Sequence, residues 1–331
     1  MYSILTMIKK MKVSIMLVSL IIPCYNEFEA LPFLYEAICD VASKCSDKSF
    51  EYIFVDDGSK DETLSRLKEM AEKDERVHYV SFSRNFGKEA AMFAGLSEAK
   101  GDLVGILDAD MQDPPSLLPE MFTMLEDEDV DVVASRRVTR KGEPRIRSFF
   151  ARQFYRIINK MSDVEIVDGA RDFRVMKRPV VDSILSLCEK QRFSKGIFSW
   201  VGYHTKWLEF ENVERVAGET KWSFWKLFLY AIEGIVSFTT VPLRLATVTG
   251  FIVSMVAFAY LLYYVIRAII LQIYNEVPGY PSLLSILLFL GGLILIALGI
   301  IGEYLAKTYM EVKNRPLYIV REENKKANDK N

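Results

Sequence analysis

Two carboxylates separated by one residue follow an apolar run in the first half of the chain. Residues 103–107 have the length and composition of a buried parallel strand, and Asp108, Asp110 and Gln112 come directly after it. Side chains at the carboxyl end of such a strand reach the crevice where open α/β sheets bind ligands. Hard oxygen ligands suit Mg²⁺ or Mn²⁺, usually together with substrate phosphates. An acidic strand-to-helix turn, capped by Asp, explains the same residues without a metal.

The elements that must position these residues alternate between strand and helix. Five short runs rich in β-branched residues cover residues 17–22, 52–55, 77–82, 103–107 and 130–134. Helical stretches separate most of them, for example residues 29–43 and 61–72. This alternation predicts βαβ units, and therefore an α/β, Rossmann-like fold with a mostly parallel sheet and helices on both faces.

Polar clusters follow four successive strands of this predicted sheet. They cover residues 23–27, 56–59 and 83–88 and the acidic stretch at 108–113. Four clusters at one edge of a sheet build a ligand crevice, which ordinary turn chemistry does not require. In such a crevice Asp57 could accept a hydrogen bond from a base N–H or a ribose hydroxyl, and Tyr25 could stack on the base. For Asp57, Gly58 and Ser59 alone, a tight turn with an N-cap remains an equal alternative.

Composition excludes a general attraction to nucleic acid. The chain has 331 residues, of which 50% are hydrophobic, and a formal net charge of -2. A chain this close to neutral has no overall field for a polyanion, so any anion site must be local, and we expect no nucleic-acid partner.

Two long apolar stretches near the C-terminus are candidates for membrane helices. Residues 245–270 and 283–305 are each long enough to cross a hydrocarbon core of about 30 Å. The connecting residues 274–281 carry no Lys or Arg, whereas basic residues precede the first stretch and follow the second. The positive-inside rule then predicts a multi-pass protein of the inner (plasma) membrane with its large N-terminal part in the cytoplasm. A buried helical hairpin of a soluble protein is the alternative.

Taken together, the motifs resemble those of the GT-A family-2 glycosyltransferases, and within them the membrane-anchored polyprenyl-phosphate glycosyltransferases. That group includes bactoprenol glucosyltransferases and dolichol-phosphate mannose synthases. The resemblance runs from about residue 17 to the second apolar stretch. Its motifs lie at residues 22–27, 54–59, 83–91, 108–113, 170–176, 192–196 and 215–221.

The resemblance implies a nucleotide-sugar donor and a divalent metal, Mg²⁺ or Mn²⁺. It assigns the metal to Asp108, Asp110 and Gln112, with the metal bridging the donor diphosphate. The residues that it implies for donor binding are Pro23, Tyr25, Glu27, Asp57, Asp108, Arg215 and Lys221. Of these, Arg215 and Lys221 lie on a loop that would close over the diphosphate.

The resemblance also implies the catalytic residue. Asp172 matches the acidic position opposite the anomeric carbon of the donor, which makes it the candidate base; a salt bridge to Arg171 or Arg174 is the alternative. Many relatives have Gly where this chain has Arg171, which changes the surroundings of Asp172.

A basic run follows the fifth strand. From it, Arg136 and Arg145 are the candidates to contact an acceptor phosphate, since guanidinium forks match phosphate oxygens. A solvated surface, or attraction to anionic lipids, is the alternative for the run.

These observations predict five segments: a leader (1–16), a GT-A catalytic domain (17–220), an interfacial amphipathic linker (221–243), two transmembrane helices (244–310) and a cytoplasmic tail (311–331). The expected reaction is inverting transfer of a hexose from a UDP-sugar to undecaprenyl phosphate, with UDP-glucose first and UDP-N-acetylglucosamine second. A transferase with a glycan or protein acceptor and a catalytically inactive membrane scaffold remain open. The resemblance further implies contact with membrane lipid and a homo-oligomer.

Overall fold

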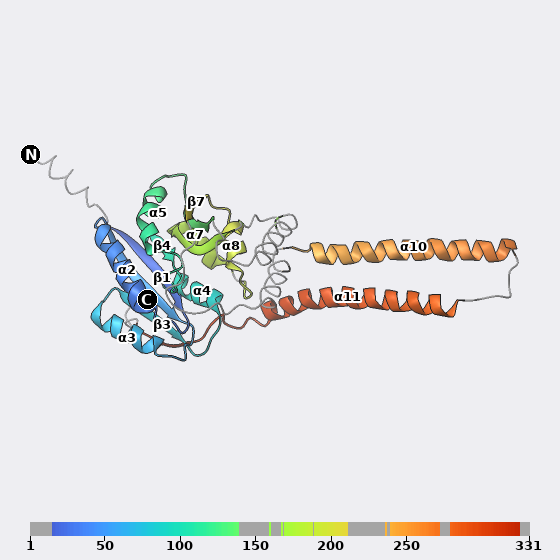
Figure 1. Ribbon diagram of the computed structural model, residues 1–331, viewed down its shortest axis with the longest axis horizontal. Coiled ribbons are helices and arrows are strands. Elements are labelled where there is room, and N and C mark those ends of the chain that lie inside the picture. Colours follow the sequence, from blue (N-terminus) through green and yellow to red (C-terminus); the bar gives the residue numbers. More distant parts are fainter. Residues whose placement is uncertain are drawn as a thin grey trace, which may run out of the picture. The chain divides into compact units, whose positions relative to one another are not determined.

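The computed structural model describes residues 15–138, 159, 167, 169–187, 189–210, 236, 239–271 and 279–324. These residues form two compact units. The first unit holds the described residues up to 210 together with those from Pro316 onward, and the second holds the two long helices (Figure 1).

One eight-stranded sheet, in the order β7-β5-β6-β4-β1-β2-β3-β8, forms the centre of the first unit. All strands except β6 and β8 run in the same direction, because only these two pair antiparallel with their neighbours. The strands are β1 (Met16–Cys24), β2 (Lys48–Asp56), β3 (Val77–Phe82), β4 (Leu103–Ile106), β5 (Val132–Arg137), β6 (Ala170–Lys177), β7 (Thr205–Phe210) and β8 (Val320–Glu323).

Helices cover both faces of this sheet, which confirms the predicted α/β fold. One face carries α2 (Leu31–Lys44), α3 (Thr63–Lys73) and α5 (Leu118–Leu125), the last following the short 3-10 helix at Pro115–Leu117. The other face carries α4 (Lys88–Glu98), α7 (Arg178–Ser186) and α8 (Ser194–Trp200).

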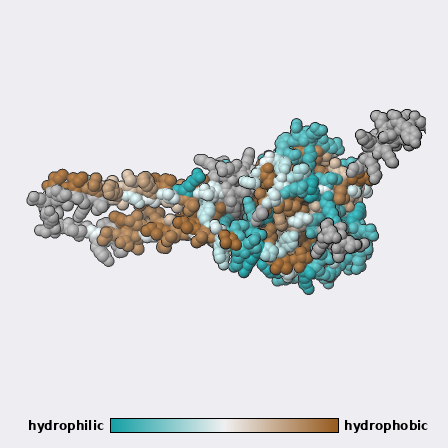
Figure 2. All heavy atoms as spheres, turned by 180° about the vertical axis from the view of Figure 1, so that it is seen from behind, coloured by the Kyte–Doolittle hydropathy of each residue, from teal (hydrophilic) through white to brown (hydrophobic). Residues whose placement is uncertain are grey.

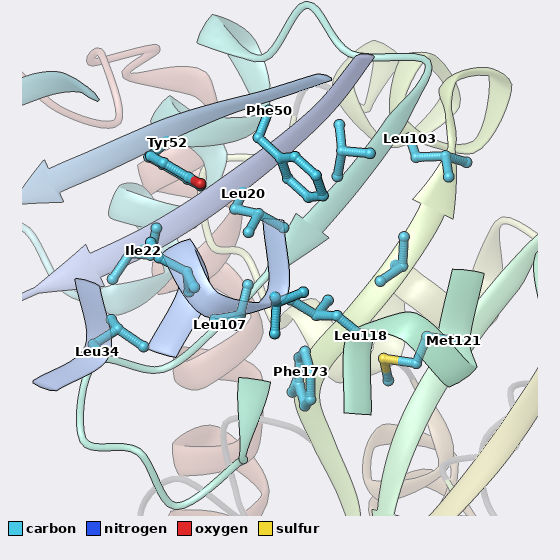
Figure 3. Packing of buried hydrophobic residues seen from close by; sticks show 14 of the residues in the cluster. Leu20, Ile22, Leu34, Phe50, Tyr52, Leu103, Leu107, Leu118, Met121 and Phe173 are labelled. Carbon is cyan, nitrogen blue, oxygen red and sulfur yellow. The ribbon is translucent and has the colours of Figure 1, made fainter. Parts of the chain in front are cut away.

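Alternate residues of the strands build the core. Leu20, Ile22 and Phe173 point to the same face and pack with side chains from α2 and α5 (Figure 3). On the opposite face α4 lies so close to β1 that a Cβ on Gly95 would come within 2.2 Å of Ile21 Cγ2. Only glycine allows that approach, and it fixes where α4 begins relative to the strand ends.

All five predicted strands are present, and the sheet contains three further strands that were not predicted, β6, β7 and β8. The strand β6 lies between β4 and β5 and runs antiparallel to both. The first residues of β6 therefore lie at the edge of the sheet where the parallel strands end.

The strand β8 comes from the region predicted to be a tail. It pairs antiparallel with β3 at the outer edge of the sheet. Asn324, just beyond β8, accepts a hydrogen bond from the N–H of Tyr79 at 2.8 Å and donates one to the carbonyl of Val77 at 3.0 Å. The ring of Tyr318 stacks on that of Phe82 with centroids 4.8 Å apart.

The second unit is a hairpin of two long helices, α10 (Val241–Leu271) and α11 (Tyr280–Val312). They lie side by side, and the hydroxyl of Tyr304 donates to the carbonyl of Thr239 at 2.5 Å. Their surfaces are predominantly hydrophobic (Figure 2), and none of the most apolar window of either helix is buried. Both helices are long and apolar enough to cross a membrane by length and composition.

Candidate active site

The loops that follow β1, β2 and β3 are tied together by side-chain hydrogen bonds to backbone groups. The N–H of Asn26 donates to Ser59 Oγ at 2.9 Å, and that of Glu27 donates to Thr63 Oγ1 at 3.0 Å. Asp56 is buried and accepts from the N–H of Ser59 and from the Ser81 hydroxyl. The loop after β1, which includes Tyr25 and begins just beyond Pro23 in β1, is therefore held against the loop after β2.

Asp57 holds the loop after β3 in place in a similar way. Its carboxylate is 3% exposed and accepts from the N–H groups of Phe86 at 2.6 Å and Gly87 at 2.9 Å. Burial raises the pKa of Asp57, and the two N–H donors act against that rise. Gly58 makes this possible, because it has φ +66° and a Cβ there would lie 2.4 Å from the carbonyl carbon of Arg84. The structure gives Asp57 this role in the loop; the predicted contact with a donor stays a prediction.

The acidic stretch lies directly beyond β4, at the same edge of the sheet. Asp108, Asp110 and Gln112 are all partly exposed there, and Met111 between them has a left-handed φ of 58°. The N–H of Gln112 donates to Asp110 Oδ1 at 3.2 Å, which closes the turn.

Asp172, near the start of β6, approaches the acidic stretch from the opposite strand direction. Since β6 is antiparallel to β4, with Arg174 paired to Ile106, its first residues lie beside the residues that follow β4. Lys88, the first residue of α4, connects the two: its Nζ lies 2.6 Å from Asp108 Oδ1 and also forms an ion pair with Asp172 Oδ2. The structure thus brings the candidate base and the candidate metal ligand to one cation.

Arg171 forms a second cationic contact on the other side of Asp108. Its Nε donates to both carboxylate oxygens of Asp113, at 3.0 and 3.1 Å, and its guanidinium donates to Gln112 Oε1 at 3.3 Å. The same group lies 4.0 Å from Asp108 Oδ2. Among the described residues, Asp172 pairs with Lys88, whereas Arg171 pairs with the fully buried Asp113 and Arg174 donates to main-chain carbonyls, so neither arginine forms the alternative salt bridge to Asp172.

The charges at the site shift the pKa values of its carboxyl groups. Burial acts to raise the pKa of Asp172, but Lys88 and Lys195 outweigh burial and hold that pKa well below the ordinary range. Burial raises the pKa of Asp113 to about 6, although Arg171 acts in the opposite direction. Asp172 is therefore ionised at neutral pH.

The donor set fits a hard divalent cation. Asp108, Asp110 and Gln112 offer oxygen atoms from a single turn, which is the number and kind that Mg²⁺ and Mn²⁺ take when phosphates complete their coordination. Among the described residues, no group of three or more His, Cys, Asp or Glu side chains forms a metal site of its own.

The remaining predicted residues lie farther along the chain. Arg136 is near the end of β5, where its guanidinium comes within 3.6 Å of Glu209 Oε1. Arg145, Arg215 and Lys221 fall outside the described residues, as does most of the predicted linker at 221–243. Within the described part of the chain, sequence reasoning gave Lys88 no role. The signal was a lysine at the first helical position after β3, at the edge where the carboxylates gather.

Comparison with known proteins assigns this fold and site to a class. The glycosyl transferase family 2 model matches residues 19–185, and the model of the GtrB C-terminal hairpin matches residues 241–308. The first match covers the sheet up to α7, including Asp108 and Asp172, and the second covers most of both long helices.

The chain belongs to glycosyl transferase family 2 and is a glycosyltransferase with a GT-A fold. It is 42% identical over 306 residues to the prophage bactoprenol glucosyl transferase homolog of Escherichia coli strain K12, which covers 92% of this chain and 99% of that protein. It is also 42% identical over 311 residues to the bactoprenol glucosyl transferase of Shigella phage SfV, covering 94% of this chain and 100% of the relative. A glycosyltransferase of Synechocystis is 43% identical over 302 residues, covering 91% and 94% of the two chains.

Proposed function

We propose that the protein transfers glucose from UDP-glucose to undecaprenyl phosphate, with inversion at the anomeric carbon. The observation that carries this proposal is the similarity to bactoprenol glucosyl transferases, which extends over the sheet, the carboxylate site and the helical hairpin alike. Transfer from UDP-N-acetylglucosamine is the second choice, because nothing in the strand-end loops identifies the sugar.

In this proposal the donor binds across the carboxyl ends of β1, β2 and β4. Pro23, Tyr25 and Glu27 contact the nucleotide together with Asp57. Asp108, Asp110 and Gln112 hold a Mg²⁺ or Mn²⁺ ion against the diphosphate. When bound, such an ion stabilises the negative charge that the nucleoside diphosphate gains as it leaves.

The acceptor phosphate binds beside Asp172. A lipid phosphate is already ionised near neutral pH, so it needs orientation more than deprotonation, and the low pKa of Asp172 is compatible with that task. Asp172, the candidate base, faces the anomeric carbon in this arrangement. Arg136 and Arg145 contact the phosphate, and Arg215 and Lys221 close over the diphosphate.

The hairpin crosses the plasma membrane twice in this proposal. The sheet contains β7 from before the hairpin and β8 from after it, so both ends of the hairpin must be in the same compartment as the sheet. An even number of crossings satisfies that condition. The basic residues beside the helix ends support the cytoplasm as that compartment. The family resemblance also suggests a homo-oligomer. Light scattering of the protein in detergent would measure its mass and therefore the number of subunits.

A donor screen tests the proposal directly. Purified protein is incubated with undecaprenyl phosphate, Mn²⁺ or Mg²⁺, and one radiolabelled donor at a time: UDP-glucose, UDP-N-acetylglucosamine, UDP-galactose or GDP-mannose. We expect label from UDP-glucose to enter the lipid phase, and a chelator or the variant Asp110→Ala to abolish it.

Other outcomes would replace the proposal with a stated alternative. Label from a different donor would change the sugar while keeping the lipid acceptor. Donor binding without any lipid label, combined with activity on a water-soluble acceptor after removal of the hairpin, would establish a non-lipid acceptor. An Asp110→Ala protein that still supports the cellular function would favour an inactive scaffold.

A further inference from the structure

Lys88 has an unusually constrained backbone for a surface lysine. It is the first residue of α4, and the two residues before it donate their N–H groups to the buried carboxylate of Asp57. At the other end of the helix, Gly95 is pressed against Ile21. The Cα of Lys88 is therefore fixed relative to the strand ends, and only its side chain is free to change direction.

That side chain connects carboxylates from two different strands. The Nζ atom lies 2.6 Å from Asp108 Oδ1, beyond β4, and pairs with Asp172 Oδ2 in β6. The Asp108 side chain is 19% exposed and that of Asp172 is 17% exposed, whereas the Lys88 side chain is 41% exposed. The Lys88 side chain is thus the most exposed of the three, although its ammonium group lies against both acids.

Asp108 is also the first of the proposed metal ligands, so Lys88 and the metal would compete for the same carboxylate. An ammonium group and a divalent ion at contact distance from one carboxylate oxygen repel each other strongly in partly buried surroundings. For metal to bind at Asp108, the ammonium must turn away.

Of the two protein cations beside Asp108, Lys88 is the one able to move. Arg171 is held by two hydrogen bonds to the fully buried Asp113 and a third to Gln112. Lys88 has a flexible four-carbon stem, and turning it toward solvent breaks no contact with a fully buried group.

We propose that Lys88 is a positioning residue that occupies Asp108 in place of the metal until the donor diphosphate arrives, so that the protein takes up metal and nucleotide together. This inference rests on the proposed metal-dependent use of a nucleotide sugar. The diphosphate supplies the negative charge to which the displaced ammonium turns. Without a nucleotide, Lys88 would exchange two carboxylate partners for Asp172 alone, and metal alone binds weakly.

Binding of Mn²⁺ to the full-length protein in detergent tests this, with electron paramagnetic resonance reporting the free ion. For the natural sequence we expect the dissociation constant for Mn²⁺ to fall at least tenfold when UDP is saturating. In Lys88→Met, Mn²⁺ alone should bind about tenfold more tightly than to the natural protein, and UDP should add correspondingly less. Lys88→Arg keeps the charge and should behave nearly as the natural protein does.

A matched control is available in Lys68→Met. Lys68 is 42% exposed and also pairs with a carboxylate, Glu322, but it belongs to α3 and to the far edge of the sheet. It should leave both Mn²⁺ constants unchanged. Thermal unfolding and UDP binding of each variant verify that the fold is intact.

Two results would overturn the inference, and only one of them would also refute the metal site. If Mn²⁺ binds with UDP but Lys88→Met binds Mn²⁺ alone no more tightly than the natural protein, only the role of Lys88 is refuted. If Mn²⁺ does not bind with or without UDP, the metal assignment at Asp108 is refuted, and the inference with it.

Discussion

At the scale of single residues, the site is a balance of neighbouring charges. Asp172 owes its low pKa to Lys88 and Lys195, and Asp113 keeps an ion pair with Arg171 despite its complete burial. The contacts also show what Arg171 contributes to the site. Arg171 lies in β6 and holds Gln112 and Asp113, which belong to the turn after the neighbouring strand β4.

The first prediction concerns Asp172→Asn. If Asp172 acts on the acceptor in the reaction, the variant should bind donor and Mn²⁺ within about threefold of the natural protein, while turnover falls by roughly 100-fold or more. Single-turnover transfer and UDP titration measure the two properties separately. Asp182→Asn, on the exposed side of α7, removes the same charge away from the site and should turn over normally. Normal turnover by Asp172→Asn would exclude Asp172 from the mechanism.

A second prediction concerns Glu89, whose buried carboxylate accepts from the N–H of Ser194 at the start of α8. Burial raises its pKa to about 7. Between about pH 4.5 and 7 the folded protein then holds a proton that the unfolded chain has lost, so stability falls as pH rises through this window, by on the order of 2–3 kcal/mol. Above pH 7 both states are ionised and the contribution of Glu89 becomes constant.

Glu89→Gln removes this titration while keeping an oxygen that can accept from Ser194. Melting temperatures between pH 5 and 8 should therefore decline less steeply for the variant than for the natural protein. Parallel curves for the two proteins would show that the Glu89 pKa is ordinary.

How much of the site was predictable from sequence differs from residue to residue. The local sequence predicts Asp108 and Asp110 as site residues because acidic residues directly follow a strand, and the family resemblance predicts Asp172. The cations that contact these carboxylates were not predicted from sequence. The pairing of Lys88 with Asp172 exists only because β6 lies beside β4 in the sheet. That pairing is a property of register, which no local pattern contains.

At the scale of elements, the strands that the sequence pattern does not reveal are β6, β7 and β8. The strand β6 places Arg174 in the sheet, where this residue is 4% exposed and its guanidinium lies 3.6 Å from the ring centroid of Phe198. A charged residue inside a strand conceals the alternation by which strands are recognised. The strand β8 is short and mostly polar, so only its partner β3 identifies it.

A third prediction tests how firmly β8 is attached. Asn324→Ala removes two side-chain hydrogen bonds to the backbone of β3, which should lower the free energy of unfolding by about 1–2 kcal/mol and the melting temperature by a few degrees. Glu36→Ala, at an exposed position of α2, is the surface control and should change little. An unchanged melting temperature for Asn324→Ala would mean that β8 contributes little to the stability of the sheet.

At the scale of the whole molecule, the chain leaves the sheet after β7, forms the hairpin and returns as β8. The helix α10 has 31 residues and α11 has 33. At 1.5 Å per residue each is about 45–50 Å long, which exceeds a hydrocarbon core of about 30 Å. Each helix is therefore long enough to cross and to extend beyond the bilayer.

A fourth prediction concerns the orientation of this hairpin. Alkaline phosphatase, which is active only outside the cytoplasm, should be active when fused after Glu276, between the two helices. Green fluorescent protein, which fluoresces on the cytoplasmic side, should fluoresce when fused after Asn331. The reverse pattern would place the sheet outside the cytoplasm, where no nucleotide sugar is expected to reach it.

The position of β8 in the chain also sets an order of events during translation. The ribosome synthesises both long helices before it reaches Val320–Glu323, so the nascent sheet has an open edge at β3 throughout that interval. An open strand edge is a template for wrong pairing, and here it closes only with a segment made after the hairpin. A chain interrupted within the hairpin can never close it. Completion of the enzyme's sheet is thereby made to depend on completion of its hairpin.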